Sequence, residues 1–143
     1  MRRSLAIFLA ALAAAACSNS TGPKVLLLPL QYAVGVLPAD SPQVNMAVAT
    51  GGRGVITATG KWVTSPDCGY NPSMAAFIVD SSIQFHLYPT TFFPNPICIA
   101  RQVGFLWAVQ TDSLRPATYR VQVLYPYIAN EEVIIATDTV VVR

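Results

Sequence analysis

The clearest structural signal in the chain is the stretch DSLRPATYRVQVL, residues 112–124. From Tyr119 onward, apolar and polar residues alternate, so that Tyr119, Val121 and Val123 share one face of an extended chain and polar side chains share the other. Such alternation is typical of a β-strand that is buried on one face. Pro116 favours a turn just before it. The stretch therefore predicts a turn that leads into a half-buried strand.

The chain from residue 24 onward repeats this pattern of extended runs and turns. The turn residues TGGR, 50–53, separate two such runs and predict a β-hairpin. Residues 131–142 are rich in Val, Ile and Thr and predict a long final strand. Three further runs alternate with a period of two: Val44, Met46 and Val48 with Asn45, Ala47 and Ala49; Ile83, Phe85 and Leu87 with Gln84, His86 and Tyr88; Val103, Phe105, Trp107 and Val109 with Gly104, Leu106 and Ala108.

The run over residues 103–109 differs from the others because both of its faces are apolar. We expect a strand of this kind at the centre of a sandwich, buried on one face and partly covered on the other. No helical pattern appears outside the N-terminus, so the sequence predicts an all-β domain.

Leu114, Pro116, Ala117 and Tyr119 resemble the Leu-x-Pro-(Gly/Ala)-x-Tyr entry to the penultimate strand of immunoglobulin-like and fibronectin-like domains. The resemblance implies a tyrosine corner, in which the hydroxyl of Tyr119 bonds back to the preceding turn. It covers residues 105–143, and the rest of the chain agrees only in its number of strands. It predicts an immunoglobulin-like antiparallel β-sandwich of about seven strands over residues 24–143.

The N-terminus has the three-part pattern of a signal peptide: Arg2 and Arg3, an apolar run from Leu5 to Ala16, and small residues at its end. The run is shorter than the roughly 20 residues that cross a bilayer as a helix. We therefore predict export, with residues 1–16 as the signal peptide.

The end of this segment, Ala14-Ala15-Ala16-Cys17, resembles the lipobox of bacterial lipoproteins, in which the cysteine is acylated. The resemblance implies a membrane anchor at Cys17 and a polar tether over residues 17–23. Ala14 stands where that family usually has Leu, and the same residues also fit ordinary secretory cleavage. In lipoproteins of bacteria with two membranes, Ser18 would imply an outer-membrane address, with the domain facing the periplasm or the cell exterior.

The length of the chain limits the number of domains, and its charge argues against one class of partner. Removing residues 1–16 from the 143-residue chain leaves 127 residues, enough for one domain. The chain has nine Lys and Arg, and without Arg2 and Arg3 seven remain, against seven Asp and Glu. A neutral chain without a basic patch gives no support for binding nucleic acid.

Three cysteines, Cys17, Cys68 and Cys98, are an odd number for an exported protein. Acylation of Cys17 would leave a pair, so we predict a Cys68–Cys98 disulfide, with two free buried thiols as the alternative. The chain-entropy model gives such a bridge about 3–4 kcal/mol of stabilisation.

No catalytic, metal or cofactor site is predicted. His86 is the only histidine, it lies on the polar face of its strand, and no Gly-x-Ser-x-Gly elbow occurs. We interpret Glu131 and Glu132 as a solvated turn and Asp138 as an outward or edge residue that discourages edge pairing. A small hydrolase built on His86 is a minor alternative. Its triad would need Ser81, Ser82 or Ser113 as the nucleophile and an acid such as Asp80 or Asp112.

The candidate recognition segment is YPTTFFPNP, residues 88–96. Its three prolines predict a surface loop rather than a central strand. Tyr88, Phe92 and Phe93 are the candidate binding residues, with packing against one end of the sandwich as the alternative for Phe92 and Phe93.

These features together predict a non-catalytic binding or structural module of the cell envelope, with a protein or glycan of the envelope as its partner. The alternative is a carbohydrate-binding module or an enzyme inhibitor that uses the segment 88–96.

Overall fold

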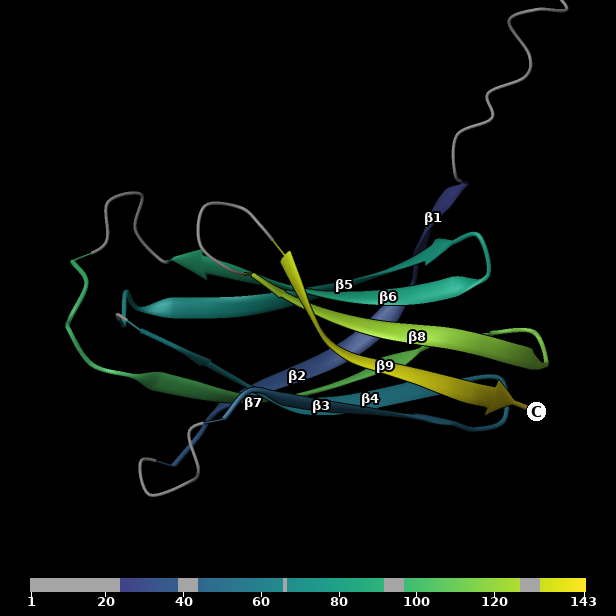
Figure 1. The fold of residues 1–143 in the computed structure, drawn as a ribbon, viewed down its shortest axis with the longest axis horizontal. Helices are drawn as coiled ribbons and strands as arrows, with labels where there is room; N and C mark the ends of the chain where they lie inside the picture. Colours follow the sequence, from purple (N-terminus) through teal and green to yellow (C-terminus); the bar gives the residue numbers. More distant parts are fainter. Residues whose placement is uncertain (1–23, 39–43, 66, 92–96, 127–131) are drawn as a thin grey trace, which may run out of the picture.

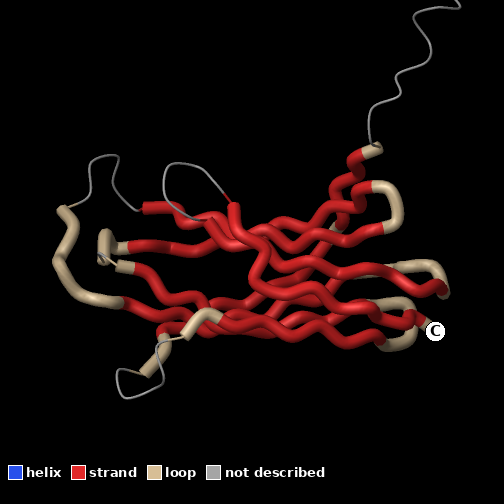
Figure 2. Tube along the Cα trace, viewed as in Figure 1, coloured by secondary structure: helices blue, strands red, loops and turns tan. Residues whose placement is uncertain are grey.

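The computed structural model describes residues 24–38, 44–65, 67–91, 97–126 and 132–143, which form two β-sheets packed face to face (Figure 1, Figure 2). These ranges contain no helix, and hence none long and apolar enough to cross a membrane. The predicted all-β sandwich is confirmed, with nine strands in place of about seven. Their bounds are β1 Val25–Leu28, β2 Leu30–Val36, β3 Met46–Gly51, β4 Ile56–Thr64, β5 Tyr70–Val79, β6 Ser82–Thr91, β7 Val103–Thr111, β8 Ala117–Pro126 and β9 Glu132–Val142.

The five-stranded sheet has the strand order β1-β5-β6-β8-β9, and the four-stranded sheet has the order β2-β7-β4-β3. Every neighbouring pair is antiparallel except β6 and β8, which run parallel. The parallel pair follows from the path of the chain, because β7 crosses to the other sheet between them and reverses direction there. Its pairing is limited to Ser82–His86 of β6 and Arg120–Leu124 of β8.

Pro29 marks the point where the chain changes sheet near one edge of the sandwich. Leu28, just before it, pairs with Ala76 of the five-stranded sheet, and Leu30, just after it, pairs with Thr111 of the four-stranded sheet. Proline has no backbone N–H to offer a ladder and favours such breaks. The first strand of the domain therefore divides into β1 and β2.

At the other edge the two sheets approach each other through β3 and β9. The carboxylate of Asp138 accepts a hydrogen bond of 3.0 Å from the backbone N–H of Ala49. A Cβ atom added to Gly51 would lie 2.1 Å from the carbonyl oxygen of Val141, so only glycine fits there. Of the two positions expected for Asp138, outward or at an edge, the second is confirmed, because β9 is the edge strand of its sheet. Its side chain does not point outward, since it bonds to the edge of the opposite sheet.

The core fills the space between the sheets with aromatic and branched side chains. The rings of Trp62 and Phe105 stack with centroids 5.4 Å apart. The side chains predicted to share one face with Phe85, with Phe105 and with Val121 are those that point into the core. The fully buried members of the core with the largest side chains are Tyr125, Phe85, Ile56, Ile83, Leu87, Val109, Val121 and Val123.

One polar network crosses this core. The hydroxyl of Tyr125, in the five-stranded sheet, accepts a hydrogen bond of 2.7 Å from Nε1 of Trp107 in the other sheet. It also lies 2.6 Å from the carbonyl oxygen of Lys61 and 2.9 Å from that of Met46. Burial raises the pKa of Tyr125, which keeps the phenol protonated and able to donate.

The alternation over residues 44–49 predicts a strand but does not show which of its faces is buried. Met46 and Val48 are exposed, whereas Ala47 and Ala49 point inward and are half-buried. The close approach of β3 and β9 leaves room only for small side chains on the inner face of β3. The larger side chains are consequently on the outer face, and Val44 precedes the strand.

The turn before β8 has the geometry of a tyrosine corner. The hydroxyl of Tyr119 donates a hydrogen bond of 3.0 Å to the carbonyl oxygen of Arg115, four residues earlier. Leu114 is buried and donates its N–H to the carbonyl of Gly54. These contacts hold the turn against the β3–β4 hairpin, which was predicted at this position.

Candidate functional site

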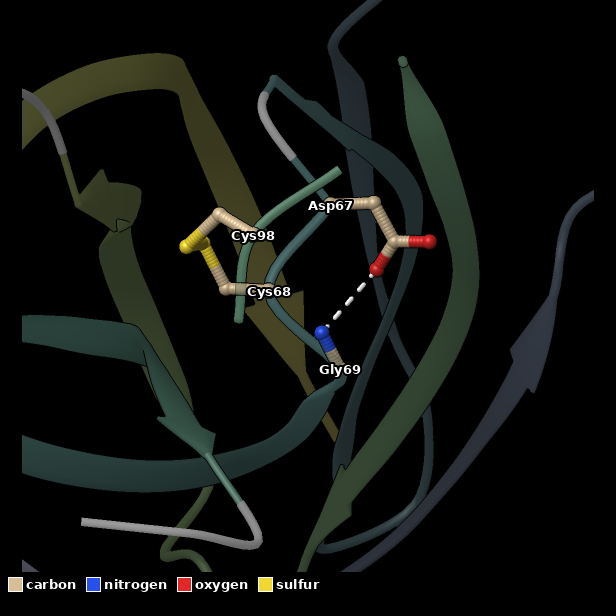
Figure 3. Close-up of a disulfide and its surroundings, with 4 residues drawn as sticks. All are labelled: Asp67, Cys68, Gly69 and Cys98. Atoms are coloured by element: carbon tan, nitrogen blue, oxygen red, sulfur yellow. Dashed lines mark hydrogen bonds between the residues drawn. A yellow bond between two sulfur atoms is a disulfide. The ribbon is translucent and has the colours of Figure 1, made fainter. Parts of the chain in front are cut away.

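The cysteine pair forms the predicted disulfide, Cys68–Cys98, between the segment that follows β4 and the segment that precedes β7 (Figure 3). An isolated β-bridge between Asp67 and Ile99 joins the same two segments. The disulfide indicates that the protein folds in an oxidising compartment outside the cytoplasm.

Asp67 holds the loops of this corner together. Its carboxylate accepts one hydrogen bond from the backbone N–H of Gly69, drawn in Figure 3, and two from the guanidinium of Arg101, at 2.8 and 2.7 Å. The pKa of Asp67 lies below its ordinary value of 3.8. The hydrogen bond from Gly69 lowers it most, and the bonds from Arg101 make the next largest contribution. The disulfide, the β-bridge and the bonds of Asp67 therefore have a structural role: they join the segment before β5 to the segment before β7.

The predicted recognition segment proved only partly a loop. Residues 88–91 belong to β6, where Pro89 lies opposite Pro72 of β5. The prediction failed because β6 pairs with β8 only as far as His86, so this part of β6 has one neighbouring strand and tolerates a proline. Phe92 and Phe93 lie outside the described residues, as does Cys17.

Tyr88 therefore lies in a strand, on the outer face of the five-stranded sheet, and its exposed fraction is 39%. Five more side chains of that face are connected to it through contacts that centre on His86, and they come from strands β5, β6, β8 and β9. We call this group the outer-face cluster; its members are Phe77, Gln84, His86, Tyr88, Gln122 and Glu132.

The centre of the cluster is an acid–base pair. Nδ1 of His86 lies 2.7 Å from Oε1 of Glu132, and Nε2 of His86 lies 3.4 Å from the side-chain oxygen of Gln84. The side chains of His86 and Glu132 are 12% and 33% exposed, so the pair is reached from solvent mainly through the carboxylate. Glu132 opens β9 and is bonded, which corrects its interpretation as part of a solvated turn.

Aromatic rings flank the imidazole on two sides. Phe77 of β5 meets it edge-on, with centroids 5.2 Å apart. The ring of Tyr88 lies nearly parallel to it, at 11° and 6.0 Å between centroids. Partial burial raises the pKa of Tyr88, and the negative charge of Glu132 raises it further. The phenol is thus neutral and available as a hydrogen-bond donor.

Two glutamines extend the cluster across the β6–β8 pair. Nε2 of Gln84 donates a hydrogen bond of 3.1 Å to Oε1 of Gln122. Gln122 is only 9% exposed, and its own amide nitrogen bonds to none of the described residues. A buried amide donor without a partner is uncommon in proteins and suits a site that is completed by a ligand or by water.

The cluster offers stacking surface, amides and a carboxylate, and none of its six members carries a serine or threonine hydroxyl. Within the described residues no serine or threonine hydroxyl hydrogen-bonds to His86, and its partners are Glu132 and Gln84 in place of Asp80 or Asp112. No group of three metal-ligating side chains occurs in this part of the chain either.

Comparison of the chain with models of protein families, with curated proteins and with solved structures gives no match.

Proposed function

We propose that this protein is a non-catalytic recognition module of the cell envelope and that it binds its partner with the outer-face cluster. The observation that carries the proposal is the setting of Tyr88, an exposed aromatic side chain held on a strand beside the Glu132–His86 pair. Tyrosine beside polar groups is favoured at binding surfaces because it combines a large apolar ring with a hydroxyl. A rigid strand orders these groups before the partner arrives, which lowers the entropic cost of binding.

A glycan is the partner class that this cluster fits best. Sugars present hydroxyls that both donate and accept hydrogen bonds, and they present C–H faces that pack on aromatic rings. The free amide nitrogen of Gln122 would donate to a hydroxyl, and the exposed oxygen of Glu132 would accept from one. A protein partner that uses the same side chains is the second candidate.

Anchoring to the membrane through Cys17 is the other part of the proposal. The lipobox-like end of the signal peptide supports it, as does the disulfide, which accounts for the remaining two cysteines. Incorporation of labelled palmitate in cells tests it directly: labelling is expected in the wild type and not in Cys17→Ala. Labelling that persists in Cys17→Ala would exclude Cys17 as the attachment site.

Binding is tested with Tyr88→Ala against a matched control, Tyr32→Ala. Tyr32 is also exposed, by 47%, but lies on the four-stranded sheet. A glycan array and cross-linking capture from the protein's own envelope are run on the wild type and on both variants. Thermal unfolding must first show that all three fold.

We expect Tyr88→Ala to weaken binding at least about tenfold, as for other central aromatic residues of interfaces, and Tyr32→Ala to leave it unchanged. Loss of the same partner in both variants, or in neither, would refute a recognition role for the outer-face cluster. Binding on the glycan array would identify a glycan as the partner, and a captured envelope protein would identify a protein.

A further inference from the structure

The outer face of the four-stranded sheet is almost without charge, and within the described residues no other segment packs on it. Strand pairing arranges its side chains in three parallel rows across β2, β7, β4 and β3. The rows are Gln31–Gln110–Thr57–Thr50, Ala33–Ala108–Thr59–Val48 and Gly35–Leu106–Lys61–Met46. Of these twelve residues only Lys61 is charged, and it is half-buried.

The face has a low side and a high side. On β2 and β7 the small residues Ala33, Gly35 and Ala108 form a floor, hollowed by two open depressions of about 290 and 370 Å³ that both include Ala33 and Ala108. On β3, at the opposite edge, Met46 and Val48 project and are 49% and 53% exposed. Leu106 of β7 also projects and is 41% exposed, so the step is confined to Ala33, Gly35 and Ala108 on one side and to Met46 and Val48 on the other.

We propose that this face binds a second copy of the chain, related by a two-fold axis that runs parallel to the strands between β7 and β4. That axis places β3 of one copy over β2 of its partner, row upon row. Val48 then lies over the partner's Ala33, and Met46 lies over the partner's Gly35. A large residue meets a small one at both places, so the step of one copy fills the step of the other.

The same arrangement accommodates the single charged residue. Lys61 of one copy lies over the partner's Leu106, so its aliphatic stem covers an apolar side chain while its ammonium group reaches the rim. The two Lys61 residues stand on opposite sides of the axis. With one cation among twelve side chains, the face offers little to an acidic protein or an anionic lipid headgroup, which favours a second copy.

The size of the face sets the strength of the dimer. Four strands about 4.8 Å apart and three rows about 6.8 Å apart cover roughly 400 Å² per copy. A stable interface of standard size takes about 800 Å² from each partner. The dimer is consequently weak, and we expect it to form in the range of about 10 µM to 1 mM.

Sedimentation equilibrium over this range tests the proposal on the exported chain carrying Cys17→Ser, so that no lipid can cause association. The wild-type face should give a mass that rises from one chain toward two. Ala108→Arg, which buries a charge at the centre of the face, should raise the dissociation constant at least about 100-fold. The matched control is Val141→Arg, at an exposed apolar position on the outer face of the other sheet, and it should leave the dimer intact.

A cross-link tests the axis itself. The double variant Ala33→Cys/Val48→Cys should give a disulfide-linked dimer on mild oxidation, and Ala33→Cys/Val141→Cys should not. A chain that stays monomeric to 1 mM, a dimer that Ala108→Arg and Val141→Arg weaken equally, or cross-linking in the control pair would each overturn the proposal. The outcome is independent of the outer-face cluster, because Tyr88 lies on the other sheet.

Discussion

The substitution Tyr125→Phe is the sharpest test of how the two sheets are held together. The hydroxyl of Tyr125 is the one group that joins Nε1 of Trp107 to the carbonyl oxygens of Lys61 and Met46. The residue is 2% exposed, so water does not replace the lost bonds unless the core opens. Phenylalanine keeps the ring and its apolar burial and removes only the oxygen.

The expected loss is worked out from those contacts. Leaving the indole N–H of Trp107 buried without a partner costs about 1–3 kcal/mol, and losing the donated bond to a carbonyl costs about 1 kcal/mol more. A loss of about 2–4 kcal/mol is a large share of the roughly 5–15 kcal/mol that stabilises a typical domain. At about 4 °C per kcal/mol for a domain of this size, the melting temperature should fall by roughly 10 °C.

Guanidinium unfolding followed by far-ultraviolet circular dichroism measures the free energy of unfolding, and an unchanged m-value shows that the folded state keeps its compactness. The control is Tyr119→Phe, which removes the hydroxyl that bonds to Arg115 at the surface and should cost no more than about 1 kcal/mol. Tyr125→Phe would refute the reasoning if it lost less than about 0.5 kcal/mol, or no more than Tyr119→Phe.

Two further predictions concern close packing and acid stability. Gly60→Ala should lower the free energy of unfolding by about 1–3 kcal/mol, because the new methyl would lie 2.3 Å from the carbonyl oxygen of Met46 and 2.4 Å from the Trp107 ring. Gly35→Ala, with nothing within 4 Å, should stay within about 1 kcal/mol of the wild type, and equal losses in the two denaturation curves would contradict this account. Asp67→Asn should remove part of the pH dependence of stability: the pKa of Asp67 is lower in the folded than in the unfolded chain, so the carboxylate stabilises the fold above about pH 4, and this contribution is lost as the pH falls below 3.8. Melting temperatures between pH 2 and 7 check it, and a variant whose curve runs parallel to that of the wild type would show that Asp67 contributes nothing.

Alternation along the sequence predicted strand faces well where a strand lies inside a sheet. Phe85 of β6, Phe105 of β7 and Val121 of β8 point inward as expected, because each strand has a neighbour on both sides there and only its two faces differ in burial. For β3 the alternation predicted a strand but did not show which face is buried. Its inner side is set by contact with β9, where Ala49 and Asp138 are 89 residues apart, and local pattern carries no information on such a contact.

The candidate site shows the same division between local and distant information. Tyr88 was predicted as a binding residue from its neighbourhood of prolines and aromatic residues, although its setting is a strand and not a loop. The partner of His86 was not predicted, because Glu132 is 46 residues away and reaches it only through the pairing of β6, β8 and β9. The signal was present as an acidic residue at the start of the predicted final strand, but nothing in the local sequence shows that this end of the strand lies beside His86.

The run over residues 103–109 gives the most instructive disagreement. Apolar residues on both of its faces predicted a central strand with a partly covered outer face, and β7 is central, between β2 and β4. Yet Leu106 is 41% exposed and Ala108 is also exposed, since no described segment of the domain covers them. An outward face that keeps apolar residues without cover from its own chain is what a contact between molecules requires. The apolar outer face of β7 thus agrees with a strand that is buried on both faces. In the proposed dimer, the second copy of the chain buries this outer face.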